Sequence, residues 1–171
     1  MFKKIKKEFY LNFGNNIITT EEQYDNIIIP KRSTIDSAGY DFFSPIEITV
    51  DPGEIIKFPT GIKWNGYKEQ KNLNYTTPWI KYNVALFLYP RSSLGFKYGF
   101  DFLNTVPIID LDYYNNPNND GHIILGFTVK KKFHINIGDK ICQGIITPTI
   151  IHTNEITPKE IRHGGIGSTG N

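Results

Sequence analysis

The sequence of 171 residues contains little cysteine and no long apolar run. Cys142 is the single cysteine, so an intramolecular disulfide is excluded, which fits a reducing compartment. It lies in the apolar run KICQGII, where we expect a small buried hydrophobic residue and not a nucleophile. No apolar stretch is long enough to cross a bilayer, and none follows the basic start as in a signal peptide. These absences predict a cytoplasmic protein without membrane association, or one of the nucleus or host cytoplasm if its source is eukaryotic or viral.

The sequence also lacks a strong excess of charge and any metal-ligand spacing. A formal net charge of +2 does not favour electrostatic binding of nucleic acid, so we expect no direct contact with it. The lysine-rich residues 3–7 are expected to be a solvated end of the chain and not a nucleic-acid arm. No cysteine pair accompanies the histidines, and their spacing matches no common metal site: His122, His134, His152 and His163.

No helical periodicity of normal length is present, whereas short apolar runs alternate with turns. Residues 46–50 alternate as a half-buried strand does, and Asp51, Pro52 and Gly53 then form a turn. Residues 27–34 read as a strand that ends at a Pro-led turn, and residues 79–89 as a further strand. The polar residues 65–78 read as a surface loop, and residues 3–13 as a strand or a short helix. Gly95 and Gly99 limit any helix after Ser93. The pattern predicts a single all-β domain, a sandwich or barrel, over residues 1–171.

In the stretch from Asn104 to Ile124, an apolar run leads into two aspartates, which is the strongest indication of a functional site in the sequence. A tyrosine pair and a loop of Asn, Pro and Gly follow, which predicts a β-hairpin with a long turn. Aspartates beside a turn are most often solvated turn formers. Asp110, however, lies between Ile109 and Leu111, where an ionised carboxylate is costly unless it has partners. Asp110 is therefore a candidate general base.

Two further segments contain residues that are suited to bind phosphate. Arg91 precedes two serines in a turn, and a guanidinium suits phosphate oxygens. The glycines of residues 165–170 match G-x-G-x-x-G, but one residue follows, so a dinucleotide-binding helix is excluded, and no lysine completes a Walker A loop. The backbone N–H groups there, with two hydroxyls, are able to wrap a phosphate chain. Arg162 is either a solvated tail residue or an arginine that closes over phosphate charge, and a flexible glycine tail is the alternative for the whole segment.

Five motifs, in order, resemble those of the trimeric all-β dUTP diphosphatase (dUTPase) family. They cover the chain from about Arg32 to its end: AGYD at 38–41, PRSS at 90–93, N-x-x-x-I-I-D-x-D-Y at 104–113, GDKICQ at 138–143 and R-x-GGIGSTG at 162–170. Each motif is only moderately specific, but five in order make a chance match improbable. The resemblance is to the bacterial and phage-like members, because of the DYYNNP-type turn.

The resemblance implies a distorted jelly-roll, or β-clip, barrel that forms a homotrimer. Each active site would combine motifs from different subunits, with residues 158–171 as a glycine-rich arm that reaches across from one subunit to another. The reaction would be hydrolysis of dUTP to dUMP and pyrophosphate, which limits uracil in DNA and supplies dUMP. Mg²⁺ would be held by the triphosphate and water, without protein ligands, since magnesium takes phosphate oxygens readily.

The family's residue roles transfer to matching positions. Asp110 would activate the attacking water, Tyr113 would lie under the deoxyribose, and Gln143 and Arg162 would complete the catalytic set. Asn104 and the backbone of residues 108–110, with Ile124, would read uracil, and Asp41 would support the site through polar contacts. The implied substrate-binding residues are Asp41, Arg91, Ser92, Ser93, Asn104, Ile108, Ile109, Asp110, Tyr113, Ile124, Ile166, Gly167, Ser168 and Thr169.

The sequence departs from the family pattern in several places, and alternatives remain. Pro107 stands where the family usually has glycine, Ile166 replaces the phenylalanine that covers uracil, and the turn at 114–120 is long. Arg162 is also closer to the glycine pair than in the commonest form. A dUTPase-like binding or regulatory protein with little turnover is one alternative. A dCTP deaminase is another, but it needs a glutamate near the third motif, and none lies between Glu69 and Glu155. The motifs of zinc deaminases are absent.

Overall fold

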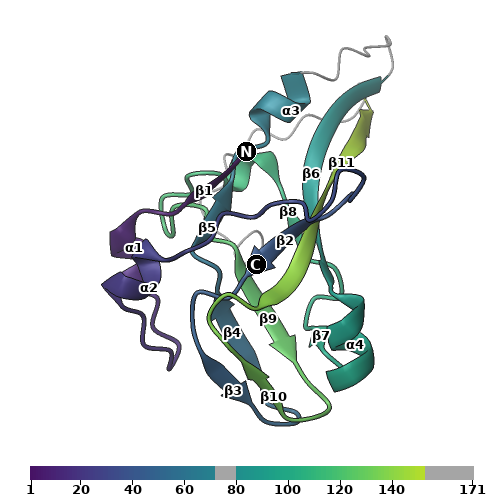
Figure 1. The fold of residues 1–171 in the computed structure, drawn as a ribbon. Helices are drawn as coiled ribbons and strands as arrows, with labels where there is room; N and C mark the ends of the chain where they lie inside the picture. Colours follow the sequence, from purple (N-terminus) through teal and green to yellow (C-terminus); the bar gives the residue numbers. More distant parts are fainter. Residues whose placement is uncertain (72–79, 153–171) are drawn as a thin grey trace, which may run out of the picture.

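The structure, a computed structural model, describes residues 1–71 and 80–152, and most of its regular elements are strands (Figure 1). The strands of this part of the chain are β1 (Phe2–Lys4), β2 (Tyr40–Phe43), β3 (Ile48–Val50), β4 (Ile56–Pro59), β5 (Ile62–Trp64), β6 (Ile80–Pro90), β7 (Asp101–Phe102), β8 (Ile108–Ile109), β9 (Ile124–Thr128), β10 (Phe133–Ile135) and β11 (Lys140–His152). The all-β prediction is confirmed. No helix in the described residues is long and apolar enough to span a membrane.

The longest pairing joins β6 and β11 into an antiparallel ribbon that curves along one side of the molecule (Figure 1). The register runs from Cys142 opposite Pro90 to His152 opposite Ile80. β2 adds to the free edge of β11 and β8 to the free edge of β6, which gives a four-stranded sheet in the order β2-β11-β6-β8. This sheet therefore brings the first four sequence motifs onto neighbouring strands.

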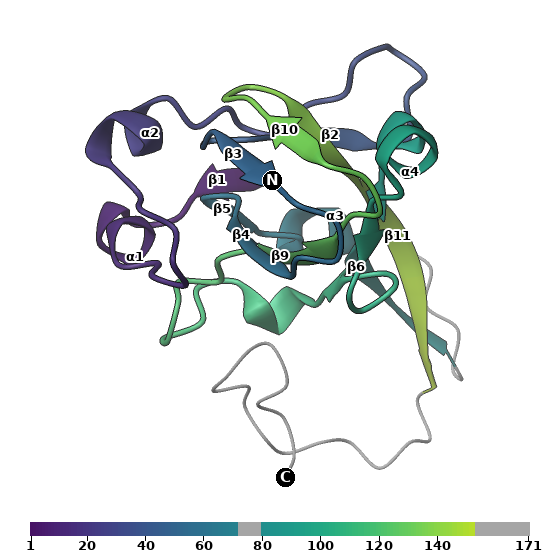
Figure 2. The same cartoon turned by 90° about the horizontal axis from the view of Figure 1, so that it is seen from below.

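Shorter sheets complete the barrel-like arrangement seen from below in Figure 2. They have the orders β4-β9-β7, β10-β3 and β1-β5, all antiparallel. Their inner faces are apolar. Phe127 of β9 is fully buried, stacks on Phe100 with ring centroids 4.4 Å apart, and contacts Phe58 of β4 at 6.0 Å. Cys142 is fully buried in the same core, as expected, and burial raises the pKa of its thiol.

The helices are short and lie at the periphery: α1 (Lys7–Leu11), α2 (Glu21–Asp25), α3 (Tyr67–Lys71), α4 (Ser92–Tyr98) and the 3₁₀ helix η1 (Leu111–Tyr113). Thr20 caps α2 by accepting a hydrogen bond from the backbone N–H of Gln23, whose side chain accepts one in return from the backbone N–H of Thr20. α4 ends where Gly99 takes a left-handed conformation, with φ of 62°. A helix after residue 91 thus forms despite Gly95.

Two local predictions were wrong. Residues 67–71, predicted as loop, form α3, and the loop prediction for 72–78 lies outside the described residues. Residues 27–34 form no strand, and only an isolated bridge joins Lys31 to Asp41, because Pro30 offers no N–H to a ladder. The start of the chain, predicted as a strand or a short helix, contains both: Phe2–Lys4 pairs with β5, and α1 follows. Lys3 and Lys6 are exposed, whereas Lys4 donates hydrogen bonds from Nζ to the carbonyls of Tyr24 and Asp25.

The predicted hairpin over residues 104–124 is also wrong. Its arms β8 and β9 do not pair with each other: β8 pairs with β6, and β9 pairs with β4 and β7. The segment between them instead forms η1 and a turn in which Asn115, Asp120 and Gly121 have positive φ. The arms thus belong to two different sheets.

His122 ties this turn to β5 from inside the protein. Its side chain is almost fully buried, and Nε2 accepts a hydrogen bond of 2.9 Å from the backbone N–H of Gly61. An imidazolium has no lone pair for that bond. Burial lowers the pKa of His122 to about 3, although the charge of Asp120 opposes the shift.

Truncation of Phe127 tests the core. Phe127→Ala should lower the free energy of unfolding by about 3–5 kcal/mol, because it removes a fully buried ring and leaves a cavity. Phe96→Ala is the matched control, since Phe96 is 92% exposed on α4 and its truncation should change stability by less than about 0.5 kcal/mol. Urea titration measures both. Equal effects of the two truncations would contradict this description of the core.

A second prediction follows from the lowered pKa of His122. Below pH 6.5 the unfolded chain binds a proton at this residue that the folded chain does not, so stability should fall as the pH drops toward 3. Between pH 6.5 and pH 5 the loss is about 2 kcal/mol. Unfolding free energies measured across this range should show it, and His122→Gln should flatten the dependence. His134→Gln, at an exposed position on β10, should leave it intact; the same slope in both variants would refute the assignment.

Candidate functional site

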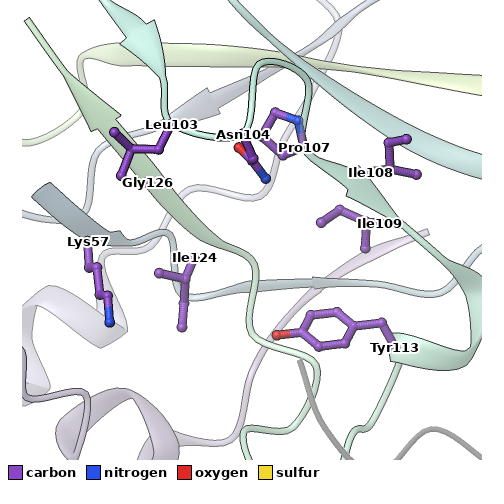
Figure 3. A pocket seen from close by; sticks show the side chains of 9 residues that line it. All are labelled: Lys57, Leu103, Asn104, Pro107, Ile108, Ile109, Tyr113, Ile124 and Gly126. Carbon is purple, nitrogen blue, oxygen red and sulfur yellow. The ribbon is translucent and has the colours of Figure 1, made fainter. Parts of the chain in front are cut away.

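A cavity of about 290 Å³ opens between the two separated arms, β8 and β9 (Figure 3). Ile108 and Ile109 border it from β8, and Ile124 and Gly126 from β9. The other lining residues are Lys57, Leu103, Asn104, Pro107 and Tyr113. Most of these side chains are apolar. The cavity is therefore able to enclose a flat, mostly apolar group whose polar atoms meet strand edges.

Within residues 1–71 and 80–152, no strand pairs with the outer edge of β8 or with the start of β9 on the side of the cavity. β8 is the last strand of its sheet and pairs only with β6. On β9, Ile124 pairs with Pro59 on one side, whereas β7 reaches only as far as Phe127. Edge strands present N–H and C=O groups in a fixed row. The two arms of the predicted hairpin thus face the cavity because they do not pair with each other.

Tyr113 is held rigidly at one side of the cavity (Figure 3). Its side chain is buried, and its hydroxyl donates to the carbonyl of His122 at 3.1 Å. The same hydroxyl accepts a hydrogen bond of 2.6 Å from Nδ2 of Asn119. Two contacts on one oxygen leave the ring little freedom to move.

Asp110 lies directly before η1, at the end of β8 and not in the middle of a strand. Its φ of −79° and ψ of 160° are extended, and its carbonyl accepts a hydrogen bond from the N–H of Tyr113 at 3.3 Å. The residue is half-buried. It lines a separate hollow of about 390 Å³ with Asp112, Asn83 and residues of α3. The predicted burial within an apolar run is therefore only partial.

A third hollow, of about 430 Å³, gathers the other predicted polar residues. Arg91 precedes α4, and Ser92 and Ser93 occupy its first turn, where both are exposed. Gln143 of β11 and Asp41 of β2 are paired across the sheet and line the same hollow. A guanidinium, hydroxyls and an amide in one depression suit the oxygens of a phosphate chain.

The charge of Asp41 is balanced by cations within this hollow. Its Oδ2 lies 2.8 Å from Nζ of Lys140 and accepts a hydrogen bond of 2.6 Å from Oγ of Ser33, while Oδ1 lies 3.7 Å from Nε of Arg91. Burial favours the neutral carboxyl, but the hydrogen bonds and charges of these groups outweigh it, so the pKa of Asp41 is lowered. Asp41 is thus a charged anchor for two cations and not a proton donor.

Gly39 allows Gln143 to lie close against the backbone. A Cβ at residue 39 would approach Oε1 of Gln143 to 2.8 Å, closer than real Cβ contacts allow. The glycine of the first motif therefore lets the amide of the fourth motif keep this position, whereas a side chain at residue 39 would displace it.

The structure brings the predicted residues together in groups and not in one place. Asn104, Ile108, Ile109, Tyr113 and Ile124 share the cavity between β8 and β9. Asp41, Arg91, Ser92, Ser93 and Gln143 share the polar hollow, and the two linings have no residue in common. Five predicted arm residues lie outside the described residues: Arg162, Ile166, Gly167, Ser168 and Thr169.

Sequence reasoning did not single out several residues at these places. Lys57 borders the cavity, although its position in β4 carries no motif. Lys140 lies in the GDKICQ motif, and this position was the only indication in the sequence that it belongs to the site. Its Nζ bridges Ser33 and Asp41. Among residues 1–71 and 80–152 no group of three or more His, Cys, Asp or Glu side chains is arranged to hold a metal ion.

Comparison with known proteins identifies the family. The dUTPase family model matches residues 25–170. A deoxyuridine 5'-triphosphate nucleotidohydrolase of Lactococcus lactis is 37% identical over 157 residues, which cover 90% of this chain and 95% of that protein.

Solved structures agree in fold. The crystal structure of dUTPase from Streptococcus mutans superposes with a TM-score of 0.61 and 30% identity, covering 88% of this chain and 96% of that one. A variant dUTPase from phage phi11 of S. aureus, described as coordinating a structural Mg(II) ion, has a TM-score of 0.55 at 19% identity over 80% of this chain and 92% of its own. With the family model spanning most of the sequence, the chain belongs to the dUTPase family.

Proposed function

We propose that the protein hydrolyses dUTP to dUMP and pyrophosphate, with Asp110 as the base that activates water. One observation carries this proposal: the apolar cavity between two unpaired strand edges, closed on one side by the doubly hydrogen-bonded Tyr113. Such a cavity suits a pyrimidine deoxynucleoside. Family membership supports the same reaction.

Backbone groups of β8 and β9 would read the base. Uracil presents an N–H between two carbonyl oxygens, and a row of backbone donors and acceptors matches one such order only. Cytosine would leave a buried group unpaired, which costs about 1–3 kcal/mol. Asn104 and Ile109 line the cavity where these contacts would form.

The Tyr113 ring would act as the floor beneath the deoxyribose. Its two hydrogen bonds, to His122 and from Asn119, keep it from yielding to a larger sugar. A ribose 2′-hydroxyl would then meet the ring without room or a partner. This arrangement supports selection of deoxynucleotides over ribonucleotides.

The polar hollow would take the triphosphate chain. Donors are offered by Arg91, Ser92, Ser93 and Gln143. Asp41 pairs with Arg91 through one carboxylate oxygen and with Lys140 through the other. Asp41 is already engaged by two cations, so this donor set suits phosphate oxygens better than a bare metal ion. Mg²⁺ fits here as part of the substrate, carried on the triphosphate, where it neutralises charge.

In the reaction, the carboxylate of Asp110 would accept a proton from water as the water's oxygen attacks phosphorus. The bond between the α- and β-phosphates breaks, and the pyrophosphate leaves with its electron pair. Positioned donors around the phosphates stabilise the charge that develops on their oxygens.

We further propose that complete sites form between subunits of a homotrimer. The cavity and the polar hollow share no lining residue, and Asp110 lies in a further hollow. A second copy that offers its polar hollow to the first copy's cavity would join them, and residues 158–171 would supply Arg162 and the phosphate-wrapping glycines. Loss of activity when the trimer dissociates would support this assembly, and full activity of the monomer would refute it.

The first test is pyrophosphate release in the presence of Mg²⁺ with four nucleotides. We expect release from dUTP, and at least roughly 100-fold lower kcat/KM with dCTP, dTTP or UTP, because each presents one group that the site leaves unpaired or cannot contain. Equal rates with dUTP and UTP would contradict the role of Tyr113. Binding of dUTP without release would favour a regulatory nucleotide-binding protein instead.

Asp110→Asn tests the proposed base. The amide keeps the shape of the carboxylate but does not accept a proton, so kcat should fall at least about 100-fold while dUTP binding is largely retained. Asp101→Asn, an exposed aspartate on β7, is the control and should keep full activity. Single-turnover kinetics measures the chemical step and calorimetry measures the affinity for dUTP, which separates the two effects. Full activity of Asp110→Asn would contradict the mechanism.

A further inference from the structure

The amino-terminal residues 1–24 lie outside the stretch that matches the family model, yet they are built into the fold. β1 pairs with β5, with Phe2 opposite Trp64 and Lys4 opposite Ile62. The N–H of Ile5 then donates to the carbonyl of Gly61 at 3.0 Å. This start of the chain therefore lies against β5, immediately beside the turn of residues 114–122.

One carboxylate connects that turn to both segments. Oδ2 of Asp120 accepts a hydrogen bond of 2.8 Å from the backbone N–H of Lys6 and lies 2.7 Å from Nζ of Lys63 on β5. The side chains of this pair are only 5% and 10% exposed, respectively. Nζ of Lys63 also donates to Oδ1 of Asn115 at 2.8 Å, at the other end of the turn. The ion pair thus closes the turn on itself and fixes it to β5.

The same turn carries both contacts that hold the site tyrosine. Asn119, directly before Asp120, donates to the hydroxyl of Tyr113, and His122 accepts from it through its carbonyl. Gly121 lies between them with φ of 75°, and a Cβ there would come within 2.5 Å of the carbonyl of Tyr113. The turn has little space in which to shift without moving the ring.

We propose that Asp120 is a positioning residue for substrate selection: with Lys63 and the N–H of Lys6 it clamps the turn that holds the Tyr113 hydroxyl. Release of the clamp lets the ring yield, so that a ribose fits where only a deoxyribose did. This inference rests on the proposed function, since it assigns Tyr113 to the sugar. It adds to the family's reaction a device built from residues outside the five motifs.

The test compares dUTP with UTP. In Asp120→Asn the Lys63 ammonium loses its counter-charge, and the ratio of kcat/KM for dUTP to that for UTP should fall roughly tenfold, as a small misplacement of a positioned group does. Tyr113→Phe removes the hydroxyl through which the clamp acts. In that background Asp120→Asn should change the ratio by less than about twofold, because the two changes act through one contact.

Two further variants separate positioning from general loss of stability. Ile135→Ala, at a fully buried position of β10, should lower the melting temperature without changing the ratio. Asn119→Ala keeps both partners of the ion pair. It removes the amide that donates to the Tyr113 hydroxyl and also the oxygen that accepts from the N–H of Gly121, so it should lower the ratio whether or not the Asp120 variant folds. An unchanged ratio in Asn119→Ala, or equal effects of Asp120→Asn with and without the Tyr113 hydroxyl, would overturn the proposal.

Failure of the inference and of the proposed function can be told apart. Calorimetry with non-hydrolysable analogues of dUTP and UTP gives the same ratio from affinities, without turnover. A wild-type protein that binds the dUTP analogue selectively but releases no pyrophosphate would contradict the proposed hydrolysis, and the variants' affinity ratios would still decide the role of Asp120. A wild-type protein that binds both analogues equally would contradict the sugar role of Tyr113 and, with it, the role of Asp120, whereas pyrophosphate release from dUTP would still decide the hydrolysis.

Discussion

The separation of β8 from β9 is the constraint on which the site depends. Each strand finds its partner elsewhere, β8 on β6 and β9 between β4 and β7, so the chain between them has to bridge two sheets. Had they paired, their backbone groups would have satisfied one another and no cavity would remain. Because they do not, a row of donors and acceptors borders an apolar space of about 290 Å³.

A bridge of this kind needs internal support, and buried polar groups provide it. His122 joins the turn to Gly61, and Asp120 joins it to Lys63 and to the backbone of Lys6. A buried ion pair is weak evidence for stability, because desolvation offsets much of its attraction. Its value here is geometric, since each group has one position in which its hydrogen bonds are satisfied. The long turn at 114–120, a departure from the family pattern, thus has a structural role.

Much of the fold and the candidate site could be predicted from the sequence, and the failures have a physical reason. Short alternating runs and turn residues are local signals, and they predicted the all-β class; the motifs predicted which residues line the cavity and the polar hollow. The hairpin prediction was wrong because distant strands decide which strands pair. Nothing within residues 104–124 indicates that β8 pairs with β6 and β9 with β4. Lys63 and Lys57 were missed for the same reason: nothing in their own neighbourhood points to Asp120 or to the cavity.

For the proposed rejection of a ribonucleotide, the rigidity of the site would matter more than its shape. UTP differs from dUTP by one hydroxyl, and an apolar pocket that yields slightly accepts an added hydroxyl with only about 100-fold discrimination. A stronger barrier requires a wall that does not move. Tyr113 meets this requirement because its hydroxyl is bound twice and its backbone abuts Gly121, so displacement of the ring would break hydrogen bonds in a buried region. If Tyr113 selects the sugar as proposed, this selectivity depends on the turn behind the tyrosine and on the amino-terminal segment, whose Lys6 N–H binds Asp120 in that turn.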